Sequence, residues 1–266
     1  MSTTDAWWGD TALKPGALRT WQIGPYRLWV RAEAREWRLW SLSSDEAMVG
    51  GIRVAEEGND DEVPDGAALT RVGLAQRDPV LTLLPAPADR DVVVRPDLPV
   101  VVPAGVRVEL YVTTPLWVVA RAGRDGPTLL DEPSHRMSDT WFGPNTLEGE
   151  LAYALRTSAT LDLEALPYVS HRAITRVSVV NAARDAFSLV KLKVPVAGLA
   201  LYDVPGSGIW TDAVTLEREQ ASDEAEVVVG NGPGAATARP ERIAEPRLAG
   251  RGPRFSLDAF GRLLGM

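Results

Sequence analysis

Residues 135–150 hold the richest mixture of acidic, basic and aromatic side chains in the chain. The candidate ligand-binding residues in this segment are Arg136, Asp139, Trp141, Glu148 and Glu150. A guanidinium group can hold an anion while a carboxylate acts as a general base, so the set would suit a small polar ligand or an enzyme that uses Glu148 or Glu150. The same residues also suit a structural role, in which an Arg136–Asp139 ion pair braces a turn. The sequence leaves both interpretations open.

The pattern around these residues predicts a loop that leads into a strand. Residues 143–145 are Gly-Pro-Asn and favour a turn. From 151 to 155, Leu, Tyr and Leu alternate with Ala, as they would along a strand with one buried face. A capped helix is the alternative, but Gly149 would weaken it by about 1 kcal/mol. We therefore expect a loop over 135–141 and a strand after the turn.

Alternation of apolar and polar residues at every second position continues through the rest of the chain. It is clearest at residues 106–113, and residues 175–194 indicate two strands joined by a turn. Further strands are predicted at 26–31, 36–42, 80–84, 91–95, 116–120, 199–203, 209–217 and 226–229. Gly, Pro, Asn and Asp separate these strands at short intervals, which favours an all-β, antiparallel, β-sandwich-like fold.

The domain organisation admits one large β-domain or two tandem β-domains, because residues 92–118 and 173–202 share a hydrophobic pattern. With two domains, we expect an N-terminal Trp-rich β-domain at 15–160 and a second sandwich-like domain at 165–235. A Gly/Pro/Arg-rich tether and a short C-terminal helix would occupy 236–266.

The C-terminal helix is predicted from apolar residues at helical spacing after a capping serine. Ser256 would cap it, and Leu257, Phe260 and Leu264 would lie on one side. A helix this short is marginal alone, so it must dock either on the protein's own body or on a partner chain. Phe260 and Leu264 are therefore candidate interface residues.

Tryptophan is unusually frequent, with nine residues in the chain. Four of them, at 21, 29, 37 and 40, lie in or beside a predicted hairpin whose turn is at 32–35. Trp29 and Trp40 are candidate interface residues, because alternation places some of the indoles on the face opposite the main core. The alternatives are that a second layer covers them, or that exposed indoles bind sugar rings as in a carbohydrate-binding module.

Motifs for other chemistry are missing from the sequence. There are two histidines, and neither has the spacing of a zinc site on a helix. The glycine-rich stretch at 230–234 lacks the spacing of a nucleotide loop, and the acidic segment 55–65 lacks that of an EF-hand. We therefore expect no cofactor and no metal.

Composition describes an ordinary folded protein, with 45% hydrophobic and 24% charged residues. The net charge of −8 argues against nucleic acid as a partner, since binding to phosphates needs a large cationic footprint. No apolar run is long enough for a membrane span, and Met1–Asp5 does not begin a secretory signal. Because cysteine is absent, we expect a cytoplasmic location.

The order of several motifs resembles an uncharacterised prokaryotic family, a domain of unknown function. The segments that carry the resemblance are "WQIGPYRLWV", "EWRLW", "RDVVVRP", "YVTTPLWV", "SDTWFGP", "GELAYAL" and "IWTD". The match would cover most of residues 15–260. It implies no activity and no catalytic residues.

The sequence favours a non-catalytic cytoplasmic binding or regulatory protein that acts through protein–protein contacts or self-association. An enzyme or small polar ligand binder that uses 135–150 is the alternative, and a carbohydrate-binding module is a further one.

Overall fold

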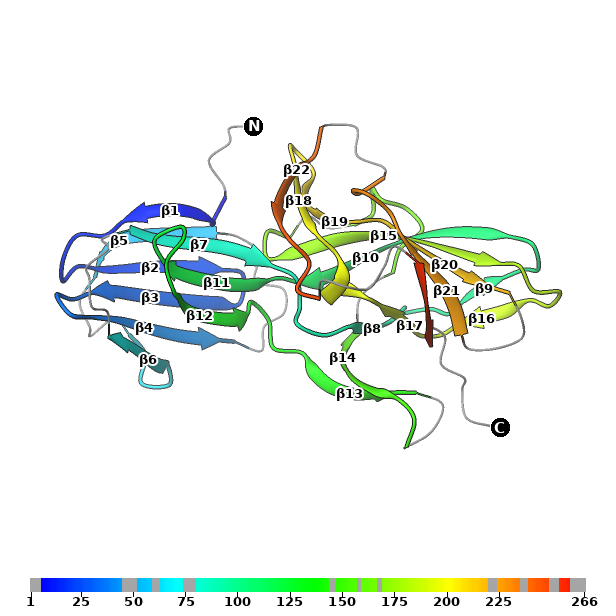
Figure 1. Ribbon diagram of the computed structural model, residues 1–266, viewed down its shortest axis with the longest axis horizontal. Helices are drawn as coiled ribbons and strands as arrows, with labels where there is room; N and C mark the ends of the chain where they lie inside the picture. The colour runs from blue at the N-terminus through cyan, green and yellow to red at the C-terminus, as the bar shows by residue number, and fades with distance from the viewer. Residues whose placement is uncertain are drawn as a thin grey trace. The chain divides into compact units, whose positions relative to one another are not determined.

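The computed structural model describes residues 6–44, 52–58, 63–73, 80–143, 147–156, 159–166, 169–219, 224–234, 239–248 and 254–258. Within them nearly all regular structure is β-strand, and one 3-10 turn, Val196–Gly198, is the only helical element (Figure 1). The prediction of an all-β protein is confirmed. No helix in the described ranges has the length and apolar character needed to cross a membrane.

The chain forms two compact units, and each is built from several separate segments. Unit 1 comprises 1–86, 115–136 and 169–171, and unit 2 comprises 87–114, 137–168 and 172–266. The division expected from the sequence used continuous segments instead. The difference arises because strands far apart in the chain pair within one unit, which local sequence patterns do not reveal.

Unit 1 contains a five-stranded sheet in the order β5-β2-β3-β4-β6 and a four-stranded sheet in the order β1-β7-β11-β12. The strands of the first are β2 (Leu18–Ile23), β3 (Tyr26–Ala32), β4 (Glu36–Ser43), β5 (Ile52–Gly58) and β6 (Ala68–Gly73). Those of the second are β1 (Gly9–Ala12), β7 (Val80–Ala86), β11 (Trp117–Ala122) and β12 (Thr128–Pro133). Alternation buries Trp21, Leu28 and Leu39 on one face of the five-stranded sheet.

Unit 2 contains an eight-stranded sheet, a four-stranded sheet in the order β13-β14-β8-β17, and the pair β16-β9. The eight-stranded sheet holds β10 (Arg107–Pro115), β15 (Arg172–Asn181), β18 (Leu201–Val204), β19 (Gly208–Thr211), β20 (Val214–Arg218), β21 (Glu224–Val229), β22 (Glu241–Ala244) and β23 (Arg254–Asp258). The other strands are β8 (Val92–Arg95), β9 (Val100–Val102), β13 (Ser138–Phe142), β14 (Glu150–Arg156), β16 (Phe187–Leu189) and β17 (Leu192–Val194).

Most strand pairs are antiparallel, but three are parallel. β14 lies parallel to β8, and β15 lies parallel to both β19 and β20. Parallel neighbours are joined by long connections, so they leave no hairpin signal in the sequence. The predicted hairpin at 26–42 is confirmed, because β3 and β4 pair antiparallel with Ala32 opposite Trp37.

Two local predictions are wrong. Ser138–Phe142 is strand β13 and not part of a loop, because it pairs with β14 over its whole length although its side chains show no clean alternation. The C-terminal helix is not seen among the described residues, and its predicted first residues are extended instead. Arg254–Asp258 is strand β23, in which Phe255 and Leu257 lie opposite Val227 and Ala225 of β21. Phe260 and Leu264 lie outside the described residues.

Most tryptophans are in the core. Trp7, Trp21, Trp29, Trp37, Trp117 and Trp210 are buried, and Trp8 and Trp40 are partly buried. Trp141 is 50% exposed. The abundance of tryptophan therefore reflects mainly packing, and one indole reaches solvent to a large extent.

Candidate functional site

The hairpin formed by β13 and β14 brings together most of the residues that the sequence singled out. Asp139 and Trp141 lie on β13, Glu150 begins β14, and Glu148 is exposed in the connection between them. Arg136 is the last residue of segment 115–136 of unit 1, and its side chain is exposed. No described hydrogen bond or ion pair joins it to Asp139, whose cation is Arg90 instead.

Against one face of the hairpin, a lysine of β17 lies in an apolar environment. Lys193 of β17 is 2% exposed, lies 5.1 Å above the Phe142 ring and forms an ion pair with Glu150. Lys191 lies at the same distance from that ring. Beneath them Val93, Phe142 and Ala152 form a buried cluster. The ion pair of Glu150 with Lys193 therefore links β14 to β17. Lys191 and Lys193 also make cation–π contacts with the Phe142 ring.

The opposite face is held by a second charged group. Asp139 and Tyr153 lie opposite one another on β13 and β14. The guanidinium of Arg90 contacts both, 2.9 Å from an Asp139 carboxylate oxygen and 5.1 Å from the Tyr153 ring centre. The Tyr153 hydroxyl donates to Asp89 over 2.8 Å. Burial, followed by the bond to Asp89, raises the pKa of Tyr153 to about 12, so the phenol stays protonated at neutral pH.

Next to this group the hairpin exposes an apolar pair. Trp141 lies opposite Leu151, and these side chains are 50% and 48% exposed. The indole lies against Gly149, where an added Cβ would come within 2.7 Å of its Nε1. A side chain at 149 would thus displace the ring. Leu147, in the connection, is 92% exposed, so the hairpin presents three apolar side chains to solvent.

The backbone of β13 has an open side. In the described part of the chain, β14 is the one strand that pairs with β13. The Tyr153 N–H donates to Asp91 in the chain leading into β8, so the backbone groups of Tyr153 point away from β13. The Asp139–Tyr153 pair is then a non-hydrogen-bonded one, and so is Trp141–Leu151 two residues on. The N–H and C=O groups of Asp139 and Trp141 therefore point to the open edge.

The predicted interface residues Trp29 and Trp40 lie opposite each other on β3 and β4. Both lie on the face opposite that of Trp21 and Leu28, as the alternation predicted. Trp29 is only 3% exposed, however, and Trp40 is partly buried. Neither offers a large exposed ring.

Other polar groups have structural surroundings. Asp212 is buried and accepts hydrogen bonds of 2.8 Å from the Ala200 N–H, the Tyr202 hydroxyl and the Gly232 N–H. His171 is fully buried against Gly24, where an added Cβ would come 2.1 Å from the ring Nδ1. Over the described residues, no group of three or more His, Asp or Glu side chains could hold a metal ion.

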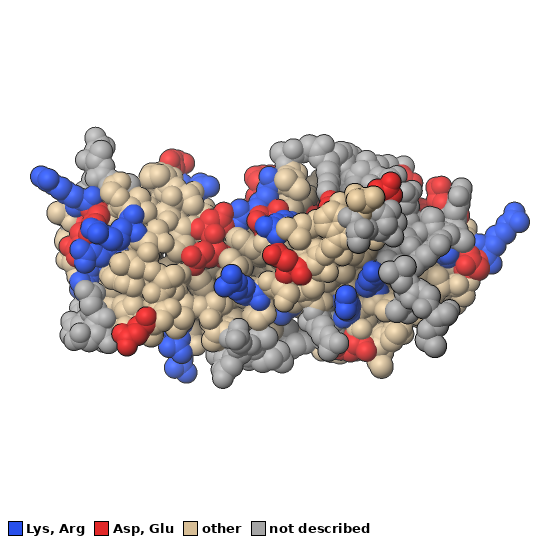
Figure 2. All heavy atoms as spheres, turned by 90° about the horizontal axis from the view of Figure 1, so that it is seen from below, with Lys and Arg blue, Asp and Glu red and all other residues tan. Residues whose placement is uncertain are grey.

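Charges of both signs are spread over the surface. On the face shown in Figure 2, the coloured basic and acidic side chains are interspersed, with uncharged surface between them. No broad cationic field of the kind that binds nucleic acid is visible on this face among the residues shown in colour.

A family model described as "Protein of unknown function (DUF432)" matches residues 7–260. The chain belongs to the DUF432 family. The resemblance predicted from the sequence motifs is thereby confirmed, and membership of the family assigns no activity to the hairpin. No curated protein and no solved structure matches the chain.

Sequence reasoning missed Arg90, Tyr153 and Lys193 as parts of this site. A lysine inside the apolar stretch 189–196 was a weak signal for a buried cation, although alternation assigned it to the polar face. Nothing local linked Arg90 to Asp139, since 49 positions separate them. Chemically, the assembled hairpin offers paired charges, exposed apolar side chains and outward backbone groups.

Proposed function

We propose that this protein is a non-catalytic binding protein that accepts an extended segment of another polypeptide as an added strand along β13. The observation that carries the proposal is the open edge of β13 beside the exposed Trp141–Leu151 pair. In strand addition, main-chain hydrogen bonds supply affinity and side chains at alternate positions supply specificity. An exposed, apolar edge without such a partner would be prone to aggregation.

The charged groups of the hairpin support binding rather than catalysis. Glu150 is bound by Lys193, and Asp139 is bound by Arg90. The phenol of Tyr153 is held protonated, because burial raises its pKa to about 12. These contacts fix the position of β14 and β13, which is what a pre-organised edge needs in order to bind without a large entropy cost.

The side chains define the kind of segment that fits. A strand added to β13 would place one residue next to Trp141, in line with Leu151. We expect this residue to be aromatic or β-branched, because such cross-strand pairs contribute up to about 1 kcal/mol each. A tryptophan at the centre of the contact is also the residue type most often found at binding hot spots.

Two substitutions at Asp139 test the proposal. Asp139→Pro removes the outward N–H and the carboxylate, whereas Asp139→Ala removes only the carboxylate. Peptides selected from a displayed random library on the wild-type protein should carry apolar residues at alternate positions. Their affinity, measured by calorimetry, should fall at least about tenfold with Asp139→Pro and remain within about threefold with Asp139→Ala.

Equal losses with the two substitutions would show that the carboxylate, and not the backbone edge, carries binding. Unchanged affinity with both would place the peptides elsewhere. Sedimentation velocity of the protein alone identifies a further outcome. If the wild type dimerises and Asp139→Pro does not, the segment that occupies β13 comes from a second copy.

We also infer a cytoplasmic location and a sandwich arrangement of the two sheets in unit 1. The absence of cysteine supports the first. The second is supported by the Tyr26 hydroxyl of β3, which donates to Glu132 of β12 over 2.9 Å. Burial, followed by the charge of Glu132, raises the pKa of Tyr26 well above its usual value.

A further inference from the structure

The five-stranded sheet of unit 1 has a second face whose composition differs from that of its core face. We call it the arginine face and define it by the side chains that alternate with the buried ones. It carries Arg27, Arg31, Arg38, Arg53 and Arg71, together with Gln22, Glu36, Trp29, Trp40, Leu42 and Leu69. Among the described side chains of this face, five are cationic and one, Glu36, is anionic.

The register arranges these residues in rows that run across the strands. Arg53, Gln22 and Arg27 lie side by side on β5, β2 and β3. Arg31, Arg38 and Arg71 lie side by side on β3, β4 and β6. Because Arg27 and Arg31 are four residues apart on one strand, the two rows are separated by about 13 Å.

An apolar row lies next to the second arginine row and is bordered by both arginine rows on β3. It consists of Trp29, Trp40 and Leu69, which are direct neighbours on β3, β4 and β6. Exposure increases along it, from 3% at Trp29 to 50% at Leu69. Arg31, Arg38 and Arg71 flank this row on one side, whereas on the other side Arg27 flanks it at β3 and Leu42 continues the apolar surface on β4.

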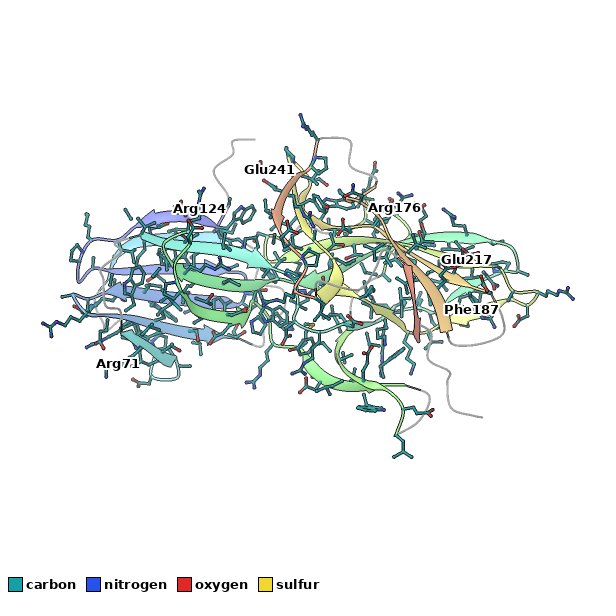
Figure 3. All side chains as sticks on the ribbon, viewed as in Figure 1. Arg71, Arg124, Arg176, Phe187, Glu217 and Glu241 are labelled. Carbon is teal, nitrogen blue, oxygen red and sulfur yellow. The ribbon has the colours of Figure 1, made fainter. Side chains whose placement is uncertain are left out.

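Part of the positive charge is neutralised within the face. Glu36 accepts hydrogen bonds from Arg38 over 2.7 Å and from Arg71 over 2.5 Å, and these bonds lower the pKa of its carboxyl. Arg71 still exposes 60% of its side chain, and Arg27 and Arg53 are exposed (Figure 3, in which Arg71 is labelled). The described side chains of the face therefore carry net positive charge, although the overall charge of the chain is −8.

From this pattern we propose that the arginine face docks an acidic amphipathic helix of another protein. Charge complementarity selects the sign of the partner. The spacing on β3 suits this form, because an α-helix with its side chains is about 10–12 Å wide and Arg27 and Arg31 lie about 13 Å apart on either side of the apolar row. Its apolar side chains would contact Trp40, Leu42 and Leu69. Carboxylates on its flanks would meet Arg27 and Arg53 on one side and Arg38 and Arg71 on the other.

An acidic polypeptide fits the face better than a nucleic acid does. Single-stranded nucleic acids need aromatic rings on which bases stack, and Trp29 is buried while Trp40 is partly buried. A helix with apolar and acidic sides instead matches both the apolar row and the arginine rows.

The test uses the full chain and a synthetic amphipathic peptide of about 18 residues, with leucine on one side and glutamate on both flanks. Arg27→Glu and Arg53→Glu are combined in one variant. Arg124→Glu and Arg184→Glu form the matched control, since both are exposed, lie outside the face and change the net charge equally. Thermal melting checks that both variants fold.

We expect the peptide to bind the wild type at low salt and to dissociate as salt rises. Affinity should fall at least about tenfold in the Arg27/Arg53 variant and less than about twofold in the control. Equal losses in the two variants, or no binding to the wild type, would overturn the proposal. So would equally tight binding of single-stranded oligothymidylate. Asp139→Pro should leave peptide binding unchanged, so this test is independent of the one on β13.

Discussion

Removing either partner of the Lys193–Glu150 pair should destabilise the protein to very different extents. The Lys193 side chain is 3% exposed, whereas that of Glu150 is 41% exposed. Glu150→Ala leaves an ammonium group buried with the Phe142 ring as its remaining described contact. Breaking a buried pair in this way costs about 3–5 kcal/mol, and we expect about 3 kcal/mol here because water reaches one side of the pair.

Lys193→Met should cost much less. The thioether fills the space of the lysine stem and can contact the Phe142 ring. The remaining Glu150 carboxylate can take up water, because it is 41% exposed. We expect a cost of about 1 kcal/mol, and a similar cost for the double variant, which gives a coupling energy of about 3 kcal/mol between the two residues.

Equilibrium urea denaturation followed by far-ultraviolet circular dichroism measures these costs without changing the ionic strength. The dependence on urea concentration should have the same slope in all four proteins. If Glu150→Ala costs no more than Lys193→Met, the ammonium of Lys193 is not desolvated. The account of β14 as a strand fixed by a buried ion pair would then be wrong.

Three further predictions concern groups outside this pair. Burial and Asp89 raise the pKa of Tyr153 from 10.0 to about 12. The stability that this shift contributes is complete below pH 10 and is lost as pH rises through 12. In a spectroscopic titration of tyrosine at 295 nm, the Tyr153→Phe variant should lack the component that titrates near pH 12. Asp212→Asn should destabilise by about 2–4 kcal/mol in urea, because the carboxylate accepts from three donors and an amide nitrogen cannot. Asp203→Asn should raise the melting temperature at pH 7, because burial, and then Glu241, raise the pKa of Asp203 and disfavour its charged form; an unchanged or lower melting temperature would contradict this.

Strands with clear alternation of apolar and polar residues could be predicted from the sequence, and strands without it could not. β4 follows the expected alternation closely, and β3 does so except at Trp29, which is buried. In β13 residues 138 and 139 are both exposed, so the period of two is absent although the ladder with β14 is complete. β13 loses the pattern because solvent reaches both of its faces at residues 138 and 139.

Predicting the site required contacts that join distant parts of the chain. Asp139, Trp141 and Glu150 were identifiable because their residue types are concentrated in one segment. Their partners Arg90 and Lys193 come from strands or turns more than 40 positions away. The helix predicted to start after Ser256 failed for the same reason, since Leu257 has helical spacing to Phe260 and Leu264 in the sequence but lies in β23, which pairs with β21.

The two proposed surfaces follow from one property of this fold, namely that most of its large aromatic side chains are consumed by the core. Six of nine tryptophans are buried, so neither surface can rely on several exposed indoles. On the hairpin, Trp141 is supplemented by backbone groups of an open edge. On the arginine face, charge takes the place of aromatic area, because Trp29 is buried and Leu69 is the most exposed apolar residue of its row. The two surfaces therefore call for partners of different chemistry, and substitutions that disable one should leave the other intact.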